Sequence, residues 1–271
     1  MNATYILGEQ KILKSEHTMN RINQKLAEKE QILSIYFSAG YPSLNDTVGI
    51  IAQLEKSGVD LIEIGLPFSD PLADGPTIQN SATAALKNGM STKVLFDQLK
   101  DVRKTVNIPL LIMGYFNPII QYGVEQFCET CAAVGIDGLI IPDLPLEIYQ
   151  SDYQELFEKY GLINVLLITP QTSESRIRQI DAASKGFIYT VSSASVTGSS
   201  TGFGTEQEAY FKRIQDMQLT NPQLIGFGIH DKQTFKTVST FAKGGIIGSA
   251  FIKHLTYNGV NRIDTFINGI R

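Results

Sequence analysis

The chain has 271 residues, of which 43% are hydrophobic and 18% are charged, a composition typical of globular proteins. The formal net charge is -4 and the 23 basic residues are scattered, which argues against nucleic acid or an anionic membrane as a partner. No apolar run approaches the roughly 18 residues of a membrane span, and the N-terminus lacks the apolar core of a signal peptide. We therefore expect a cytoplasmic protein.

Residues 1–18 look unlike part of a folded core, whereas an amphipathic helix begins at Met19 in MNRINQKLAEKE. We expect either that Met19 is the natural start or that residues 1–18 form a flexible extension. Residues 19–271 contain no linker and no low-complexity tract, so we expect one catalytic domain there.

Eight short apolar runs rich in β-branched residues follow along the chain, as expected for parallel strands that are buried on both faces. The predicted strands are Leu33–Ser38, Asp60–Gly65, Pro109–Gly114, Gly138–Pro142, Asn164–Thr169, Gly186–Val191, Gln223–Gly228 and Gly245–Gly248. Amphipathic stretches separate them, and several end in a glycine suited to the position just after a helix: Gly58, Gly135 and Gly161.

Eight β-α units in one chain predict an α/β fold of the (β/α)8 TIM-barrel type. The extra N-terminal helix precedes the barrel, and a short phosphate-binding helix is expected after the eighth strand. An open doubly wound sheet would favour a Gly-rich phosphate turn after the first strand, but SAGYPSLND stands there instead. In a barrel, the chemistry is expected at the carboxyl ends of the strands.

The two cysteines, Cys128 and Cys131, lie in a helical stretch without a second C-x-x-C pair, so we interpret them as buried or half-buried thiols. The histidines His17, His230 and His254 show no ligand spacing. The sequence thus predicts no metal site.

Three carboxylates follow the second strand in EIGLPFSDPLADGP, namely Glu63, Asp70 and Asp74. If Leu61, Glu63 and Gly65 share a face, that face points into the barrel, where desolvation raises a carboxyl pKa and suits it to proton transfer. The alternative for Glu63 is a structural ion pair. Loop aspartates often only cap turns, and Asp74 is the better candidate of the two.

Glycine-rich turns follow the last three strands. They include Gly198 in the strand-six loop, Gly226 and Gly228 after the seventh strand, and Gly248-Ser249 before the helical stretch FIKHL. Backbone N–H groups and a helix N-terminus bind phosphate without a basic side chain, so we infer a phosphate ester substrate.

Four further polar residues at strand ends have two interpretations each. Tyr189 is either a core aromatic or part of the site. Tyr115 and Asn117 either bond a neighbouring loop or act in catalysis, and Asp143 acts either on the ligand or on loop geometry.

EIGLPFSDPLADGPTIQ closely resembles the signature of tryptophan synthase α subunits, and ordered companions support the resemblance over residues 19 to about 270. These companions are SAGYP, MGYFNPI, IIPDLPLE, FIYTVS, SVTG, GFGI and IIGSAFIK. The resemblance implies a lyase of tryptophan biosynthesis that cleaves indole-3-glycerol phosphate into indole and glyceraldehyde 3-phosphate.

Carried onto matching positions, the resemblance makes Glu63 the general acid/base and Asp74 the partner of the indole N–H, with Tyr189 beside Glu63. It implies a phosphate site formed by Thr197, Gly198, Gly228, Gly248 and Ser249, and an indole pocket lined by Tyr36 and Met113.

The resemblance also implies a β-subunit partner in an α2β2 complex. Pyridoxal phosphate is expected only in that partner, so no cofactor is assigned to this chain. One departure from the family pattern is Ser195, which stands before V-T-G where the family usually has glycine. A serine restricts the φ angle there more than a glycine does, so this departure bears on how the loop closes. Three alternatives remain. The first is a standalone lyase with the same residues, and the second is a non-catalytic barrel that activates a partner. The third is another phosphate-binding barrel enzyme, which would need a catalytic Lys or a Cys/Asp pair at strand ends.

Overall fold

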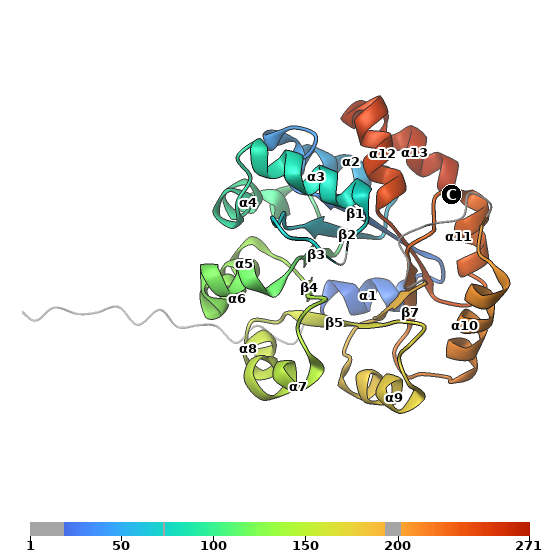
Figure 1. The fold of residues 1–271 in the computed structure, drawn as a ribbon. Coiled ribbons are helices and arrows are strands. Elements are labelled where there is room, and N and C mark those ends of the chain that lie inside the picture. The colour runs from blue at the N-terminus through green and yellow to red at the C-terminus, as the bar shows by residue number, and fades with distance from the viewer. Residues whose placement is uncertain (1–18, 73, 193–201) are drawn as a thin grey trace, which may run out of the picture.

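The computed structural model describes residues 19–72, 74–192 and 202–271, which form a closed barrel of eight parallel strands surrounded by helices (Figure 1). Each strand pairs with the next along the chain, and β8 pairs with β1 to close the ring. The strands are β1 (Ile32–Ser38), β2 (Leu61–Gly65), β3 (Leu110–Met113), β4 (Gly138–Ile140), β5 (Ile163–Ile168), β6 (Ile188–Val191), β7 (Gln223–Gly226) and β8 (Gly244–Ile247).

The predicted TIM barrel is confirmed, and each strand lies within two residues of its predicted bounds. The helices are α1 (Arg21–Glu28), α2 (Thr47–Lys56), α3 (Pro76–Lys87), α4 (Thr92–Leu99), α5 (Phe116–Tyr122), α6 (Val124–Val134), α7 (Leu146–Ile148), α8 (Gln154–Lys159), α9 (Glu174–Ala183), α10 (Thr205–Asp216), α11 (Lys232–Val238), α12 (Ser249–Asn258) and α13 (Ile263–Ile270). The glycines predicted to follow three of them, Gly58, Gly135 and Gly161, have positive φ angles of 87°, 83° and 70°. Glycine enters this region without the steric cost that a Cβ imposes.

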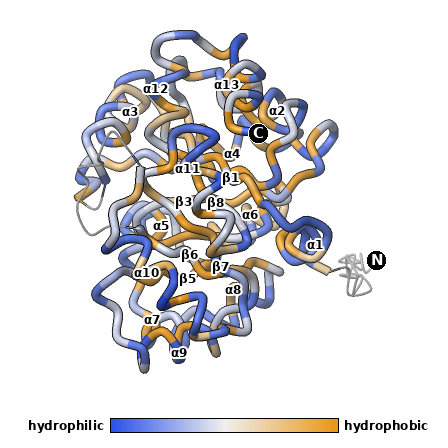
Figure 2. The backbone as a smooth tube through the Cα atoms, turned by 90° about the vertical axis from the view of Figure 1, so that its right-hand side faces the viewer, coloured by the Kyte–Doolittle hydropathy of each residue, from blue (hydrophilic) through white to orange (hydrophobic). Residues whose placement is uncertain are grey.

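The strands bury side chains on both faces, because alternate residues point into the barrel and out toward the helices. In β2, Leu61 belongs to the cluster inside the barrel, whereas Ile62 belongs to the larger cluster between strands and helices. Figure 2 shows the hydrophobic stretches gathered along the central strands and the hydrophilic ones mostly at outer helices and turns. Cys128 and Cys131 are free, buried thiols on α6, as expected, and burial raises the pKa of Cys128 to about 12.

Helix α1 closes the amino end of the barrel. Its apolar residues Ile22 and Leu26 pack into the cluster inside the barrel. At the amino end of β4, a Cβ atom on Gly138 would lie 2.9 Å from Ile22 Cδ1, so a glycine leaves room for the helix there. In Figure 1, α1 lies in the middle of the ring of elements, apart from the outer helices.

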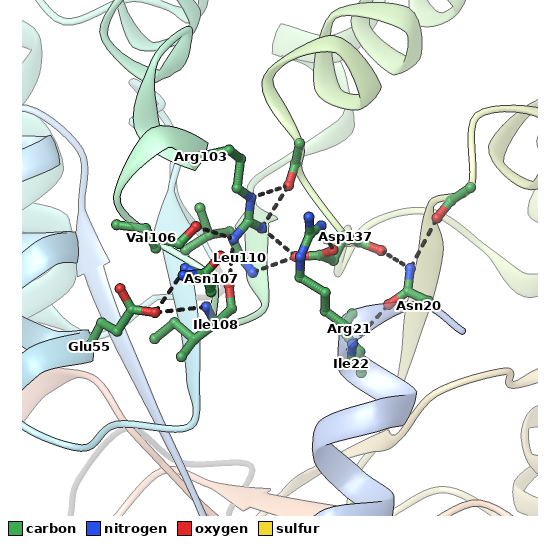
Figure 3. A network of polar contacts seen from close by, with 12 residues as sticks. Asn20, Arg21, Ile22, Glu55, Arg103, Val106, Asn107, Ile108, Leu110 and Asp137 are labelled. Carbon is green, nitrogen blue, oxygen red and sulfur yellow. Dashed lines mark hydrogen bonds and ion pairs between the residues drawn. The ribbon is translucent and has the colours of Figure 1, made fainter. Parts of the chain in front are cut away.

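A buried carboxylate holds α1 in this position (Figure 3). Asp137, which directly precedes β4 and is 4% exposed, accepts a hydrogen bond from Arg21 at 2.8 Å and one from Arg103 at 2.5 Å. It also accepts the Leu110 backbone N–H at 2.9 Å. The Asn20 amide, which caps α1, donates to the Asp137 carbonyl oxygen at 2.8 Å. One side chain thus joins α1, β3 and the short 3-10 helix Val102–Lys104 that contains Arg103.

We expect Asp137→Ala to lower the free energy of unfolding by about 2–4 kcal/mol, because it leaves two cations and a buried N–H group without their acceptor. Urea denaturation measures this change as a lower midpoint. Asp101→Ala is the matched control, since Asp101 pairs with Lys104 in an exposed ion pair, and it should leave the midpoint unchanged. Equal midpoints for both variants would contradict the role given to Asp137.

Within the described part of the chain, no group of three or more His, Cys, Asp or Glu side chains is arranged to hold a metal ion. No helix in those ranges is long and apolar enough to cross a membrane.

Candidate active site

A cavity of about 980 Å³ lies at the carboxyl ends of the strands. Seven of the residues predicted from the sequence line it: Tyr36, Asp74, Met113, Tyr189, Gly228, Gly248 and Ser249. They come from six different strands or the loops that follow them, so only closure of the barrel brings them together. Thr197 and Gly198, as well as the unusual Ser195, fall outside the described residues.

Glu63 points into the barrel, as the alternation of β2 predicts, but it does not line the cavity. Its side chain is 0% exposed, and its Oε1 atom accepts a hydrogen bond from the Ser34 hydroxyl at 2.7 Å. Ser34 lies two residues before Tyr36 on β1, and Tyr36 is the register partner of Glu63. The carboxyl group is therefore turned toward the amino end of the barrel, away from the mouth that the carboxyl ends of the strands form.

The second carboxyl oxygen of Glu63, Oε2, is buried without a hydrogen-bond partner among the described residues. Burial raises the pKa of Glu63 from its ordinary value of 4.5 to about 7, and the Ser34 hydrogen bond offsets part of that rise. The ion-pair interpretation of Glu63 is therefore wrong, because its bonded partner is a neutral hydroxyl. A carboxyl group that titrates near neutrality and keeps one oxygen free is suited to proton transfer.

Asp74 lies in the loop between β2 and α3, on the wall of the cavity. Its Oδ2 atom accepts a long hydrogen bond of 3.4 Å from the Tyr115 hydroxyl. Burial raises the pKa of Asp74 from 3.8 to about 6, and the bond from Tyr115 lowers it in part. The Gln79 amide of α3 donates to the Asp74 carbonyl oxygen at 2.9 Å and so ties the loop to α3.

The structure gives the contacts of the other polar residues. Tyr115 bonds the neighbouring loop through Asp74, whereas Asn117 is exposed on α5. Asp143 accepts the Phe116 backbone N–H at 2.9 Å, a contact that holds the loop after β3. Asp70 is exposed and accepts from the Ser69 hydroxyl beside it, which agrees with a loop role.

Two tyrosines on the cavity wall lie directly over glycines of neighbouring strands. A Cβ atom on Gly65 would be 2.2 Å from the Tyr36 hydroxyl oxygen, and one on Gly226 would be 2.3 Å from that of Tyr189. Neither position tolerates a side chain while the tyrosine stays in place. Burial raises the pKa of the Tyr189 hydroxyl well above 10, so this hydroxyl stays protonated.

A smaller, apolar hollow of about 20 Å³ adjoins the cavity on the side of Asp74. It shares Tyr36, Asp74 and Met113 with the cavity, and its other lining residues include Leu66, Phe68, Tyr115 and Pro142. At this size the hollow has room for about one water molecule, so it extends the aromatic and aliphatic wall of the large cavity beside Asp74 and is not a ring-sized site by itself.

The opposite side of the cavity offers backbone N–H groups. Gly248 is the N-cap of α12, and the first intrahelical bond in that helix is donated by Ile252 N–H to the Gly248 carbonyl oxygen at 3.0 Å. The N–H groups before Ile252 have no partner within the helix, and they bind anions readily.

After β7, the two consecutive residues Phe227 and Gly228 have φ angles of +70° and +80°. The Ser192 hydroxyl donates to the Phe227 carbonyl oxygen at 2.8 Å and helps to hold this turn. Positive φ is rare for a residue with a side chain, and such residues cluster at functional sites.

Ser34 and Lys253 also belong to this region, and neither was among the residues predicted from the sequence. Ser34, the partner of Glu63, shares the inward face of β1 with Tyr36, so the alternation of that strand could have pointed to it. Lys253 lines the cavity beside Gly248 and Ser249, and its spacing of four residues from Ser249 on one helix was the available signal. A separate open hollow of about 780 Å³ at the other end of the barrel, beside α1, contains none of the predicted residues.

Comparison with known proteins gives consistent matches. The family profile described as tryptophan synthase alpha chain matches residues 22–266. The tryptophan synthase alpha chain of Flavobacterium psychrophilum is 70% identical over 252 residues, which cover 93% of this chain and 100% of that one. That of Phocaeicola vulgatus is 58% identical over 86% of this chain and 91% of its own.

Solved structures agree with these matches. The tryptophan synthase subunit alpha of Legionella pneumophila has a TM-score of 0.83 at 32% identity, covering 93% of this chain and 97% of that one. An aminoacrylate-bound tryptophan synthase from M. tuberculosis has a TM-score of 0.81 at 26% identity over 93% and 98% of the two chains. The predicted family is therefore confirmed: this chain belongs to the tryptophan synthase alpha chain family, lyases of tryptophan biosynthesis that act on indole-3-glycerol phosphate.

Proposed function

We propose that Glu63 and Asp74 perform the cleavage of indole-3-glycerol phosphate, Glu63 as the proton-transfer group and Asp74 as the anionic partner of the indole N–H. Two carboxyl groups inside one barrel, Asp74 on the cavity wall and Glu63 buried beneath it, have pKa values that burial raises toward neutrality, and they support this proposal most directly. The cavity that Asp74 lines also opens on the N-terminus of α12.

The reaction needs a proton at indole C3 before the bond between C3 and the glycerol carbon can break. That proton comes from the carboxylic acid form of Glu63 and converts the ring into an indolenine with a positive N–H. The adjacent glycerol hydroxyl then loses its proton to the Glu63 carboxylate. The bonding pair between the two carbons returns to C3 and neutralises the ring nitrogen, which leaves indole and the aldehyde of glyceraldehyde 3-phosphate.

Asp74 stabilises the positive N–H of the indolenine. A fixed carboxylate in a partly dry site is most effective where charge develops during the reaction. The part of the large cavity that Tyr36, Asp74 and Met113 line is the proposed site of the indole ring. Tyr189 stays protonated and closes the floor of the cavity beside β7.

These roles require Glu63 to be protonated and Asp74 to be ionised when the substrate binds. Glu63, with a pKa of about 7, is protonated below that value, and Asp74, with a pKa of about 6, is ionised above its own. We therefore expect kcat/KM to be highest between about pH 6 and pH 7 and to fall on either side.

Glu63 must also reach the cavity. Its carboxyl group bonds Ser34 in the layer below, and one of its oxygens has no partner. We propose that the side chain rotates toward the mouth of the barrel when the indole ring is present, exchanging the Ser34 bond for contact with the substrate.

The phosphate belongs at the other side of the cavity, near Gly228, Gly248 and Ser249, where helix α12 begins. Thr197 and Gly198 are proposed to complete this site, on the resemblance of SVTG to the family. No cofactor is proposed for this chain.

The proposed partner is a tryptophan synthase β subunit that contains pyridoxal phosphate, in a cytoplasmic α2β2 complex. We expect the isolated chain to release indole slowly from indole-3-glycerol phosphate, and turnover to rise when the β subunit is added. A standalone lyase would show full turnover alone with no response to the β subunit. A chain that releases no indole in either condition would be a non-catalytic barrel, and the proposal would fail.

A further inference from the structure

Lys253 is the single Lys or Arg among the described residues that line the cavity. It shares that wall with Gly228, Gly248 and Ser249, where the phosphate is proposed to bind. The acidic residues Asp74 and Glu206 line the same cavity, and the chain has a net charge of -4. A dianionic ester therefore enters surroundings whose side chains are negative on balance.

The position of Lys253 on α12 directs its side chain toward the proposed phosphate site. Ser249 and Lys253 are four residues apart, so they lie on the same face of the helix. Side chains on a helix lean toward its N-terminus, which places the long stem of Lys253 along the turn that carries the free N–H groups. From this wall of the cavity, the ammonium group can reach a ligand that is bound by those N–H groups.

The Lys253 ammonium group is also available to bind an anion, as far as the described part of the chain shows. It is exposed and forms no ion pair with any carboxylate there. In contrast, Lys185 and Lys243, beside the hollow at the other end of the barrel, are paired with Glu158 and Glu30. His230, a further cavity residue, has Nδ1 3.0 Å from the Gly228 carbonyl oxygen.

We propose that the Lys253 ammonium forms an ion pair with the phosphate dianion of the substrate and so adds a charge to the backbone N–H groups of α12. This inference rests on the proposed function, since it assigns a binding residue to the same site. It also revises the expectation that backbone dipoles alone hold the phosphate. A helix N-terminus supplies about half a positive charge, whereas a phosphate dianion carries nearly two negative ones.

The test compares Lys253→Met with Lys253→Arg. We expect Lys253→Met to raise KM for indole-3-glycerol phosphate by about 10–100-fold, the loss of one charge-assisted contact, while kcat changes less than about threefold. Lys253→Arg keeps the charge and should stay within a few fold of the parent KM. Salt should raise the KM of the parent and have less effect on Lys253→Met.

Lys236→Met is the matched control, because Lys236 is an exposed lysine on the neighbouring helix α11 that does not line the cavity, and it should behave as the parent. Calorimetric titration with inorganic phosphate gives a readout that does not depend on turnover, and Lys253→Met should weaken this binding about 10-fold or more. If Lys253→Met fails to fold, Lys253→Gln takes its place, because glutamine also lacks the charge but has a polar side chain.

An unchanged KM in Lys253→Met, or a fall in kcat with KM intact, would overturn the role of Lys253. Failure of the proposed function has a different signature, because the parent chain itself would then release no indole. In that case the phosphate titration still decides whether Lys253 binds the anion.

Discussion

Glu63→Gln is expected to lower kcat for indole release by about 10²–10⁴-fold, the usual contribution of a positioned acid or base. The amide keeps the size of the side chain and can still accept the Ser34 hydroxyl hydrogen bond. It cannot donate a proton to indole C3 or take one from the glycerol hydroxyl. Steady-state assays of indole release measure the loss, with and without the β subunit.

Loss of fold should not accompany this loss of activity. Burial raises the pKa of Glu63 to about 7, so the folded state binds its proton more tightly than the unfolded chain does. Ionisation of Glu63 therefore destabilises the fold as the pH rises from about 4.5 to about 7, and this destabilisation persists above pH 7. Glu63→Gln removes it, and we expect the variant to be at least as stable as the parent at pH 8.

Glu129→Gln provides the matched control. Glu129 is an exposed glutamate in the middle of α6, and it does not line the cavity. It should keep the activity of the parent. Near-native turnover in Glu63→Gln would show that another group transfers the proton, and the proposed mechanism would be wrong.

Asp74→Asn is expected to lower kcat by about 10²–10³-fold, a loss typical when one group that stabilises developing charge is removed. Some activity should remain, because the amide oxygen can still accept a hydrogen bond from the indole N–H. The pH profile gives a second readout. Below about pH 6 the parent should lose activity as Asp74 gains a proton, whereas the residual activity of Asp74→Asn should lack this acidic limb.

Asp70→Asn is the control for the loop itself, because Asp70 lies in the same loop but is exposed, and its side chain accepts from the neighbouring Ser69 hydroxyl. We expect its activity and pH profile to match those of the parent. If Asp74→Asn retained the acidic limb, that limb would belong to another group and Asp74 would lose its assigned role.

Local patterns in the sequence were enough to predict the barrel and much of the site. Apolar runs and the glycines that follow helices are set by contacts within a few residues, so the strand bounds and the positions of Gly58, Gly135 and Gly161 could be predicted. The alternation of β2 likewise placed Glu63 inside the barrel, and the family motif pointed to Asp74 on its rim.

Contacts between distant segments could not be predicted in this way. Ser34 and Glu63 are 29 residues apart, and their hydrogen bond depends on the register between β1 and β2. The same holds for Asp137, which meets Arg21 from 116 residues away. Such pairs form only when the barrel closes, because closure fixes which strands are neighbours and the register in which they pair.

The sequence by itself therefore determined the fold and the family, and it pointed to the two carboxylates that we propose to act in the reaction. Only the tertiary structure decided how these groups are held. It turned the Glu63 carboxyl group toward Ser34, set the two tyrosines over Gly65 and Gly226, and made Lys253 part of the wall of the same cavity as Gly248 and Ser249. The pKa of a carboxyl group and the direction of a side chain depend on what surrounds them in space, and neighbours in space are mostly not neighbours in the chain.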